Sequence, residues 1–217
     1  MRVILIRHGQ TDWNESGIFR GRIDVKLNPN GIRQAEIIGE VLKNVHIDAV
    51  YSSPLSRAFD TATAIARYHS LTVEVYEPIT DINFGEWQGL NRSEVESRYP
   101  VIFGVWLSAP EKVEIPNGET LSQVRQRLVV GLKEILSRHP EGTVVLVSHG
   151  LTNKVLLCAM LGLDNSHFWK VKQDNGAINI LKYSGNGSKV FLMNETTHLQ
   201  SIGEIVEDMK KIENPLG

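Results

Sequence analysis

Apolar runs of strand length alternate with segments of helical periodicity along this chain of 217 residues. Short runs rich in β-branched residues predict strands at residues 2–6, 47–53, 71–78 and 142–150, and two further strands joined by a glycine-rich turn over 178–196. Apolar residues spaced three or four positions apart predict helices at residues 30–44, 54–69, 91–100, 120–140 and 151–161.

The segment 120–140 has the clearest helical pattern. Its apolar face is formed by Leu121, Val124, Leu128, Leu132 and Ile135. Thr120 and Gln123 fit a capping box at its start. The same spacing in the segment 30–44 predicts an apolar face of Ile32, Ala35, Ile38 and Leu42.

Proline and glycine set the expected ends of the other helices. Pro54 is acceptable in the first turn of the helix that contains it. Pro100 is expected to stop the segment 91–100, because the residue before a proline avoids helical geometry. Gly162 is expected to close the segment 151–161.

Repeated alternation of strands and helices is typical of α/β proteins with a largely parallel sheet. We therefore predict a three-layer α/β/α sandwich with a mostly parallel central sheet. The sequence contains no linker, repeat or low-complexity tract, so residues 1–217 are expected to form one domain with a polar tail from about residue 201.

Composition and charge exclude several classes of protein. The formal net charge is −2 and the sequence pI is about 6.4, which argues against a nucleic-acid or membrane surface. Cys158, the single cysteine, cannot form an internal disulfide, and no CxxC pair offers a zinc site. The chain has no long apolar run, and its first residues are too short for a secretory signal, so a cytoplasmic location is expected.

Two predicted strands end in the same way. "VILIRHG" at residues 3–9 resembles "VVLVSHG" at residues 144–150, and each apolar run leads into a histidine and a glycine. Ligands of parallel α/β sheets bind beyond the carboxyl ends of strands, so His8 and His149 should face one crevice. Arg7 and Arg57 should lie beside them, because Arg57 follows the strand 47–53.

These residue types indicate phosphoryl chemistry. Guanidinium groups donate in pairs to phosphate oxygens. Cations beside an imidazole lower its pKa, and a neutral imidazole nitrogen is a competent nucleophile. Gly9 is expected to let the backbone, with its N–H, approach the ligand closely.

"LIRHGQTDWN" resembles the signature of the histidine phosphatase superfamily, which includes the cofactor-dependent phosphoglycerate mutases. Five further segments match that family in its order, namely "LNPNGIRQAE", "YSSPLSRAFDTA", "FGEWQGL", "NGETL" and "VLVSHG". Together the six motifs cover most of the chain up to about residue 200. The resemblance implies the phosphoglycerate mutase-like fold and a reaction in two covalent steps.

The resemblance also implies roles for individual residues. His8 would be the nucleophile that becomes a phosphohistidine, and Arg7, Arg57 and His149 would stabilise the transferring group. The substrate-binding residues would be Asn14, Arg20, Gly21, Gly150 and Leu151. Asn14 could equally cap the turn that follows it. The family needs no metal and no other cofactor, and its substrate would be a small phosphorylated metabolite.

This sequence departs from the family pattern at two positions. Asp81 stands where the family usually has the glutamate that protonates the leaving oxygen and later activates water. Asp81 is the expected acid, with Glu86 as a less favoured alternative. Arg20 stands where many relatives have Gln or Thr, and the added cation suggests a substrate with a second anionic group, such as a carboxylate.

The family contains both hydrolases and mutases. The short span between Asp81 and His149 has no adjacent arginine pair of the kind that binds a second phosphate in the mutases, which favours hydrolysis. Phosphoserine, alpha-ribazole phosphate and a broad substrate range remain open, because Phe84 replaces a histidine expected in phosphoserine phosphatases. A mutase and a non-catalytic phospho-ligand binding protein are the alternatives. A role of His198 near the pocket and a homodimer are also open.

Overall fold

The computed structural model describes residues 1–184 and 187–200 and contains a six-stranded mixed sheet. The strands are β1 (Arg2–Arg7), β2 (Ala49–Ser52), β3 (Val73–Val75), β4 (Thr143–Ser148), β5 (Ile178–Ser184) and β6 (Gly187–Glu195). They lie in the order β3-β2-β4-β1-β5-β6. The pairs β3–β2, β2–β4 and β4–β1 are parallel, and β5 is antiparallel to both neighbours, so the sheet is mostly parallel as predicted.

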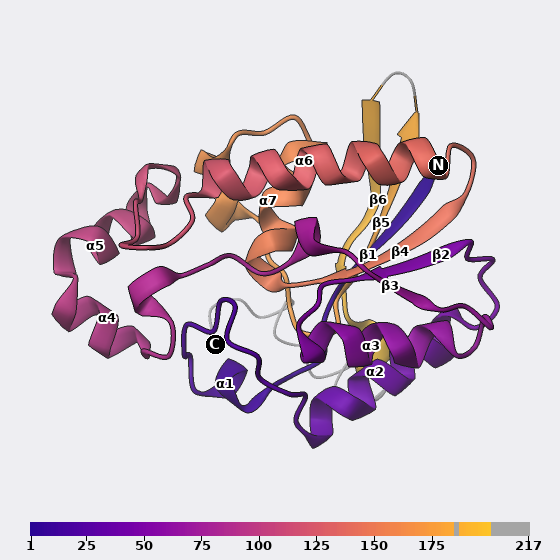
Figure 1. Cartoon of the computed structure of the whole chain (residues 1–217), viewed down its shortest axis with the longest axis horizontal. Coiled ribbons are helices and arrows are strands. Elements are labelled where there is room, and N and C mark those ends of the chain that lie inside the picture. Colours follow the sequence, from indigo (N-terminus) through magenta and orange to yellow (C-terminus); the bar gives the residue numbers. More distant parts are fainter. Residues whose placement is uncertain (185–186, 201–217) are drawn as a thin grey trace, which may run out of the picture.

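Helices cover both faces of this sheet (Figure 1). The longer helices are α2 (Pro29–Leu42), α3 (Ser56–Ala66), α6 (Leu121–Arg138) and α7 (Gly150–Met160). Because side chains alternate along a strand, β1 sends Ile4 and Ile6 into the core shared with α2 and α3. Val3 and Leu5 enter the opposite core, shared with α6 and α7. The predicted three-layer α/β/α sandwich is confirmed.

The caps of α6 and α2 explain where these helices begin. Thr120 Oγ1 accepts the Gln123 N–H at the start of α6, and the five predicted apolar residues of this helix are buried. Asn28 Oδ1 accepts the Gly31 N–H at the start of α2. Ile32 is 53% exposed, so its predicted place on the apolar face is wrong, and the neighbouring Gly31 is the buried residue there.

Proline positions account for two further differences. Helix α3 begins at Ser56 after the N-cap Leu55, so Pro54 lies just outside the helix that was expected to include it. The helix α4 (Arg92–Arg98) ends before Pro100 as expected, but Pro100 begins another helix, α5 (Pro100–Ser108). A proline is well tolerated at the first position of a helix, since no intrahelical N–H bond is lost there.

The third predicted strand is shorter than the segment 71–78. Only Val73–Val75 pairs with β2, and the chain then enters a 3-10 helix over Glu77–Ile79. A short helix, α1 (Asp12–Glu15), was not predicted. No helix among the described residues is long and apolar enough to cross a membrane. The tail predicted from residue 201 lies outside the described residues.

Candidate active site

The carboxyl ends of β1 and β4 meet at one edge of the sheet. Arg7 is in register with Ser148, and the His8 N–H donates to the Ser148 carbonyl oxygen (3.0 Å). The residues that follow these strand ends, His8 and His149, are therefore neighbours, with ring centroids 5.1 Å apart. The repeated strand pattern predicted that the two histidines lie at one edge of the sheet, and both side chains are fully buried there.

One hydrogen bond defines the tautomer of His8. Its Nδ1 lies 2.6 Å from the carbonyl oxygen of Gly9, and a carbonyl oxygen can only accept, so Nδ1 carries the proton. In the neutral ring the lone pair is then on Nε2, which is buried and has no hydrogen-bond partner among the described residues. Burial lowers the pKa of His8 well below its usual value, and the charges of Arg57, Arg7 and Arg20 lower it further. The imidazole is therefore a neutral base with a free nitrogen.

The hydroxyl of Ser53 orients His149 in the same way. Ser53 Oγ accepts the Leu55 N–H and lies 2.8 Å from Nε2 of His149. Nδ1 of His149 faces Asp81 Oδ2 at 3.7 Å, and a carboxylate oxygen accepts, so we assign the ring proton to Nδ1 and the Ser53 hydroxyl as donor to Nε2. Nδ1 of His149 then carries the ring proton and is a donor, with no hydrogen-bond partner in the described part of the chain. Burial and the nearby arginines lower the pKa of His149 as well. Sequence reasoning missed Ser53, although it belongs to the quoted motif "YSSPLSRAFDTA".

Three arginines surround the two imidazoles. Arg57 is fully buried and donates from Nη2 to Gly21 O (2.8 Å) and from Nη1 to Ile23 O (3.0 Å). Arg7 donates from Nη1 to Gln173 O (2.6 Å). Burial lowers the pKa of Arg7 to about 10, a value at which the guanidinium stays charged at neutral pH.

Buried nitrogen atoms without a partner gather in this cluster. Five of them belong to the residues described above and to Arg20, namely Arg7 Nε, His8 Nε2, Arg20 Nε, Arg57 Nε and His149 Nδ1. A buried polar atom without a hydrogen bond costs free energy, so such atoms require an explanation. Four of the five are donors, which is the arrangement that an anion such as a phosphoryl group would satisfy.

Asp81 lies inside this cluster. Its Oδ2 is 3.2 Å from Arg57 Nη2 and 3.7 Å from His149 Nδ1, and its Oδ1 accepts the Ile82 N–H. The side chain is 6% exposed. Glu86, the alternative acid, is exposed and accepts hydrogen bonds from the side chains of Tyr99 and Asn117. The structure therefore brings Asp81, and not Glu86, to the histidines.

Arg127 holds the loop that carries Asp81. Its guanidinium donates to the backbone oxygens of Pro78 (2.7 Å), Thr80 (2.8 Å) and Asp81 (3.3 Å). Glu119 accepts from Arg127 and also from the Asn83 N–H (2.8 Å). Sequence reasoning quoted the motif "NGETL" that contains Glu119 but assigned it no task, because these contacts join residues far apart in the sequence.

Gly9 has a different task from the one expected. Its N–H donates to Thr61 Oγ1 (3.2 Å), so it is not free for a ligand. A Cβ at Gly9 would lie 2.3 Å from the carbonyl oxygen of Gly31, at the start of α2. The absence of a side chain lets the loop after β1 touch this helix. At Gly150 a Cβ would lie 3.0 Å from Nε of Arg7, so this glycine keeps the guanidinium accessible.

A cavity of about 390 Å³ adjoins the cluster. The predicted substrate-binding residues all line it, namely Asn14, Arg20, Gly21, Gly150 and Leu151. Arg7 and Asp81 also line it, whereas His8, His149 and Arg57 lie buried behind its surface. Asn14 has a structural contact too, since its Oδ1 accepts the Thr11 N–H and caps α1. Both interpretations of Asn14 are thus compatible with its position.

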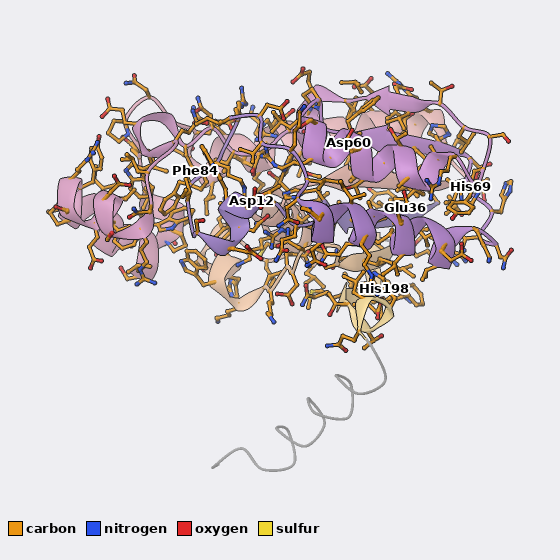
Figure 2. All side chains as sticks on the ribbon, turned by 90° about the horizontal axis from the view of Figure 1, so that it is seen from below. Asp12, Glu36, Asp60, His69, Phe84 and His198 are labelled. Carbon is orange, nitrogen blue, oxygen red and sulfur yellow. The ribbon has the colours of Figure 1, made fainter. Side chains whose placement is uncertain are left out.

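His198 does not line the cavity. It belongs to the 3-10 helix Thr197–Leu199, which contacts α2, and its Nδ1 pairs with Glu195. Figure 2 shows His198 at the end of the described chain, well separated from Phe84. Phe84 lines the cavity and packs edge-on against Phe19, with centroids 5.0 Å apart. The suggested approach of His198 to the pocket is therefore not seen.

The described residues contain no group of three or more His, Cys, Asp or Glu side chains that could hold a metal ion. The donors of the cluster are guanidinium and imidazole groups, whose N–H atoms suit an anion.

Comparison with known proteins gives the same family as the motifs. The model of the histidine phosphatase superfamily (branch 1) matches residues 3–196. The chain is 36% identical over 199 residues to Phosphoserine phosphatase 1 of Hydrogenobacter thermophilus, with 92% of this chain and 94% of the relative covered.

Two solved structures have the same fold. The YhfR protein of Bacillus stearothermophilus superposes with a TM-score of 0.88 at 27% identity, covering 92% of this chain and 99% of that one. The phosphoserine phosphatase of Entamoeba histolytica in complex with 3-phosphoglyceric acid gives a TM-score of 0.83 at 29% identity, with the same coverage.

The fold and the family match define an enzyme of the phosphoglycerate mutase-like class. The chain belongs to the histidine phosphatase superfamily. It is a phosphatase, a hydrolase that acts on phosphomonoesters.

Proposed function

We propose that this protein hydrolyses a small phosphorylated metabolite through a phosphohistidine formed on His8, without a metal ion. The observation that carries this proposal is the unpartnered, buried Nε2 of His8 among arginine and histidine donors that also lack partners. A neutral nucleophile surrounded by preorganised cations suits transfer of a phosphoryl group, because such donors stabilise the charge of the transition state.

In the first step Nε2 of His8 attacks phosphorus, and the bond between phosphorus and the ester oxygen breaks. Arg7, Arg20, Arg57 and His149 donate to the phosphoryl oxygens. Protonated Asp81 gives its proton to the leaving oxygen, so the alcohol departs neutral.

In the second step a water molecule attacks the phosphohistidine. The carboxylate of Asp81 takes a proton from this water, and the bond between phosphorus and Nε2 breaks to release inorganic phosphate. His8 returns to its neutral state, and Asp81 is again protonated for the next substrate molecule. Asp81 thus acts as the acid in the first step and as the base in the second step.

Hydrolysis is favoured over mutase activity by the span between Asp81 and His149. A mutase must retain a bisphosphorylated intermediate, and the adjacent arginines that serve this purpose in the mutases have no counterpart here. Arg125 and Arg127, both in that span, donate to backbone oxygens of Leu163 and of the Asp81 loop. These two guanidinium groups therefore stabilise the fold and do not correspond to the adjacent arginines of the mutases.

The substrate class is narrowed by the similarity to phosphoserine phosphatases, which supports a small phosphorylated acid. Alpha-ribazole phosphate is a second candidate, because six aromatic residues line the cavity and could pack against its ring system. They are Trp13, Phe19, Phe84, Phe103, Trp106 and Trp169.

The test is hydrolysis of p-nitrophenyl phosphate by the wild-type protein and by His8→Ala, in the presence and absence of EDTA. We expect turnover that EDTA does not reduce and that His8→Ala lowers by at least about a thousandfold. Binding without turnover would favour the non-catalytic alternative. Rapid formation of 2-phosphoglycerate from 3-phosphoglycerate, dependent on 2,3-bisphosphoglycerate, would favour a mutase.

A further inference from the structure

The cavity contains two cations beyond those that surround the histidines. Lys154 lies on α7, one helical turn after Gly150, and Arg92 is the first residue of α4. Among the described residues that line the cavity, Asp81 alone carries a carboxylate, and it is paired with Arg57. The cavity therefore has an excess of positive charge that no described lining residue balances.

Lys154 is held in place by two aromatic rings. Its Nζ lies 4.8 Å from the ring centroid of Trp169 and 5.1 Å from that of Phe168. These contacts orient the ammonium at the cavity wall and remove part of its hydration. Within residues 1–184 and 187–200, no hydrogen bond or ion pair is formed by this Nζ.

The carboxylate with the largest effect on the pKa of Lys154 already has partners of its own. Asp174 raises the pKa of Lys154, but its carboxylate pairs with Lys172 (2.9 Å) and accepts from Asn194 Nδ2 (2.8 Å). Burial and the charge of Arg7 have the larger effect and lower the pKa of Lys154 to about 8. The ammonium is thus charged at neutral pH, partly desolvated and without a carboxylate partner. Such a group gains most from an anionic ligand.

Arg20 is not the cation that would bind a second anionic group of the substrate. Its charge lowers the pKa of both His8 and His149, and its Nε is one of the unpartnered donors of the cluster. We place it with the phosphoryl group, so a second anion needs another cation. Arg92 is exposed and lies over the ring of Phe103, where water screens its charge. Lys154 is the better candidate.

We propose that Lys154 determines specificity by binding an anionic group, such as a carboxylate, on the leaving part of the substrate. The substrate class is then a phosphomonoester of a hydroxy acid, whose carbon skeleton lies against Trp169 and Trp106. This inference rests on the proposed phosphatase reaction, because the phosphoryl group must occupy the arginine cluster while the acid reaches Lys154.

The experiment compares two esters that differ by one carboxylate, phosphoserine and phosphoethanolamine. We expect the wild-type protein to have the higher kcat/KM for phosphoserine. In Lys154→Met, which keeps the length of the side chain and removes its charge, the ratio of the two kcat/KM values falls by about 10- to 100-fold. The loss appears mainly as a higher KM for phosphoserine, because the contact exists in the bound state before reaction. Lys154→Arg retains most of the ratio.

A matched control is Lys133→Met, which removes an exposed lysine of α6 with the same change in net charge. It should leave the ratio within about twofold of the wild-type value, as expected for a solvated charge. Thermal unfolding of both variants shows whether a change in the ratio of kcat/KM values comes from a loss of stability instead of a loss of substrate recognition.

The experiment distinguishes failure of the Lys154 proposal from failure of the proposed phosphatase reaction. If wild-type protein hydrolyses p-nitrophenyl phosphate but Lys154→Met leaves the ratio of phosphoserine to phosphoethanolamine unchanged, the role of Lys154 is refuted and the phosphatase reaction stands. If wild-type protein hydrolyses none of the three esters, the proposed function itself fails. Preference for alpha-ribazole phosphate over phosphoserine, unaltered in Lys154→Met, would also refute the role of Lys154.

Discussion

Arg57 Nη2 and Asp81 Oδ2 lie 3.2 Å apart, and both side chains are buried. The guanidinium that should bind the phosphoryl group is thus partnered by the proposed acid when no substrate is bound. Arrival of the phosphoryl group would give Arg57 a competing anion, and the carboxyl group would become free to reach the leaving oxygen. In the proposed reaction the pair would couple binding of the substrate to placement of the proton donor.

This coupling gives a prediction for Asp81→Asn. The amide cannot donate a proton to the leaving oxygen, so kcat for phosphoserine should fall by about 10²- to 10⁴-fold. The fall should be smaller for p-nitrophenyl phosphate, whose leaving group is stable without a proton. Steady-state kinetics with both esters measure the difference. An equal fall for both would show that Asp81 does not act as the acid, and Asp81→Glu should retain more activity than Asp81→Asn.

The Arg127 contacts predict a positioning residue for the acid. Arg127→Met removes three hydrogen bonds to the backbone around Asp81, so kcat should fall about 10- to 100-fold with little change in KM. The free energy of unfolding should fall by about 1–3 kcal/mol, because the carbonyl groups lose their partner. Activity and urea unfolding are measured on the same sample.

Arg138→Met is the matched control for this variant. Arg138 is an arginine of the same helix, but its ion pairs with Glu74 and Glu134 are exposed. Neither kcat nor the free energy of unfolding should change by more than a small amount, since exposed pairs contribute little. The role of Arg127 would be contradicted if both variants lost kcat equally.

Burial of His8 and His149 predicts how stability depends on pH. Each pKa is lower in the folded protein than the usual 6.5, so the unfolded chain binds more protons below that pH. Stability is therefore fully present above about pH 6.5 and declines as the pH falls toward the folded pKa values, by up to about 1.4 kcal/mol per pH unit for each histidine. Urea unfolding between pH 5 and 7 should show this slope. His8→Asn should remove about half of it, and an unchanged slope would contradict the assignment.

Lys154 predicts a second effect of pH, on binding of a carboxylated ester. Burial has the largest effect on the pKa of Lys154 and lowers it, the charge of Arg7 lowers it further, and Asp174 and Cys158 raise it. Because its pKa is about 8, the ammonium loses its proton as the pH rises above 8, and KM for 3-phosphoglycerate should then rise by up to about tenfold per unit. Ethylene glycol phosphate, which lacks the carboxylate, should show a weaker rise. Lys154→Arg should flatten the profile, since an arginine stays charged.

Sequence patterns predicted the layers of the fold and the histidines of the site for the same reason. β1 and β4 are buried on both faces, so their apolar runs are continuous and end abruptly at polar residues. The site residues at those ends, His8 and His149, follow directly from that rule. The position of Arg57 followed from the strand before it.

The features of the structure that the sequence did not predict depend on contacts between segments far apart in the chain. Helix α5 is apolar on most of its surface, so it has no periodicity that separates a buried face from an exposed one. Ser53 contacts His149, which is 96 residues away. Arg127 binds backbone oxygens 46 to 49 residues away. Lys154 lies against two aromatic rings 14 and 15 residues away. No local pattern encodes such contacts. The expected use of the Gly9 N–H for a ligand is wrong because Thr61 Oγ1 accepts this N–H, and the close approach of Gly9 to Gly31 joins two segments that no local pattern connects.

The excursion formed by α4 and α5 supplies one wall of the cavity through Arg92, Phe103, Trp106 and Leu107 and adds no strand to the sheet (Figure 1). The proposed reacting groups, in contrast, stand at the ends of β1 and β4 and on the segments that follow β2 and β3. This wall of the cavity is therefore encoded in a stretch of the chain that is separate from the proposed reacting groups. Exchange of residues 91–108 for another sequence would offer evolution, or an engineer, a route to new esters that leaves the nucleophile where it is.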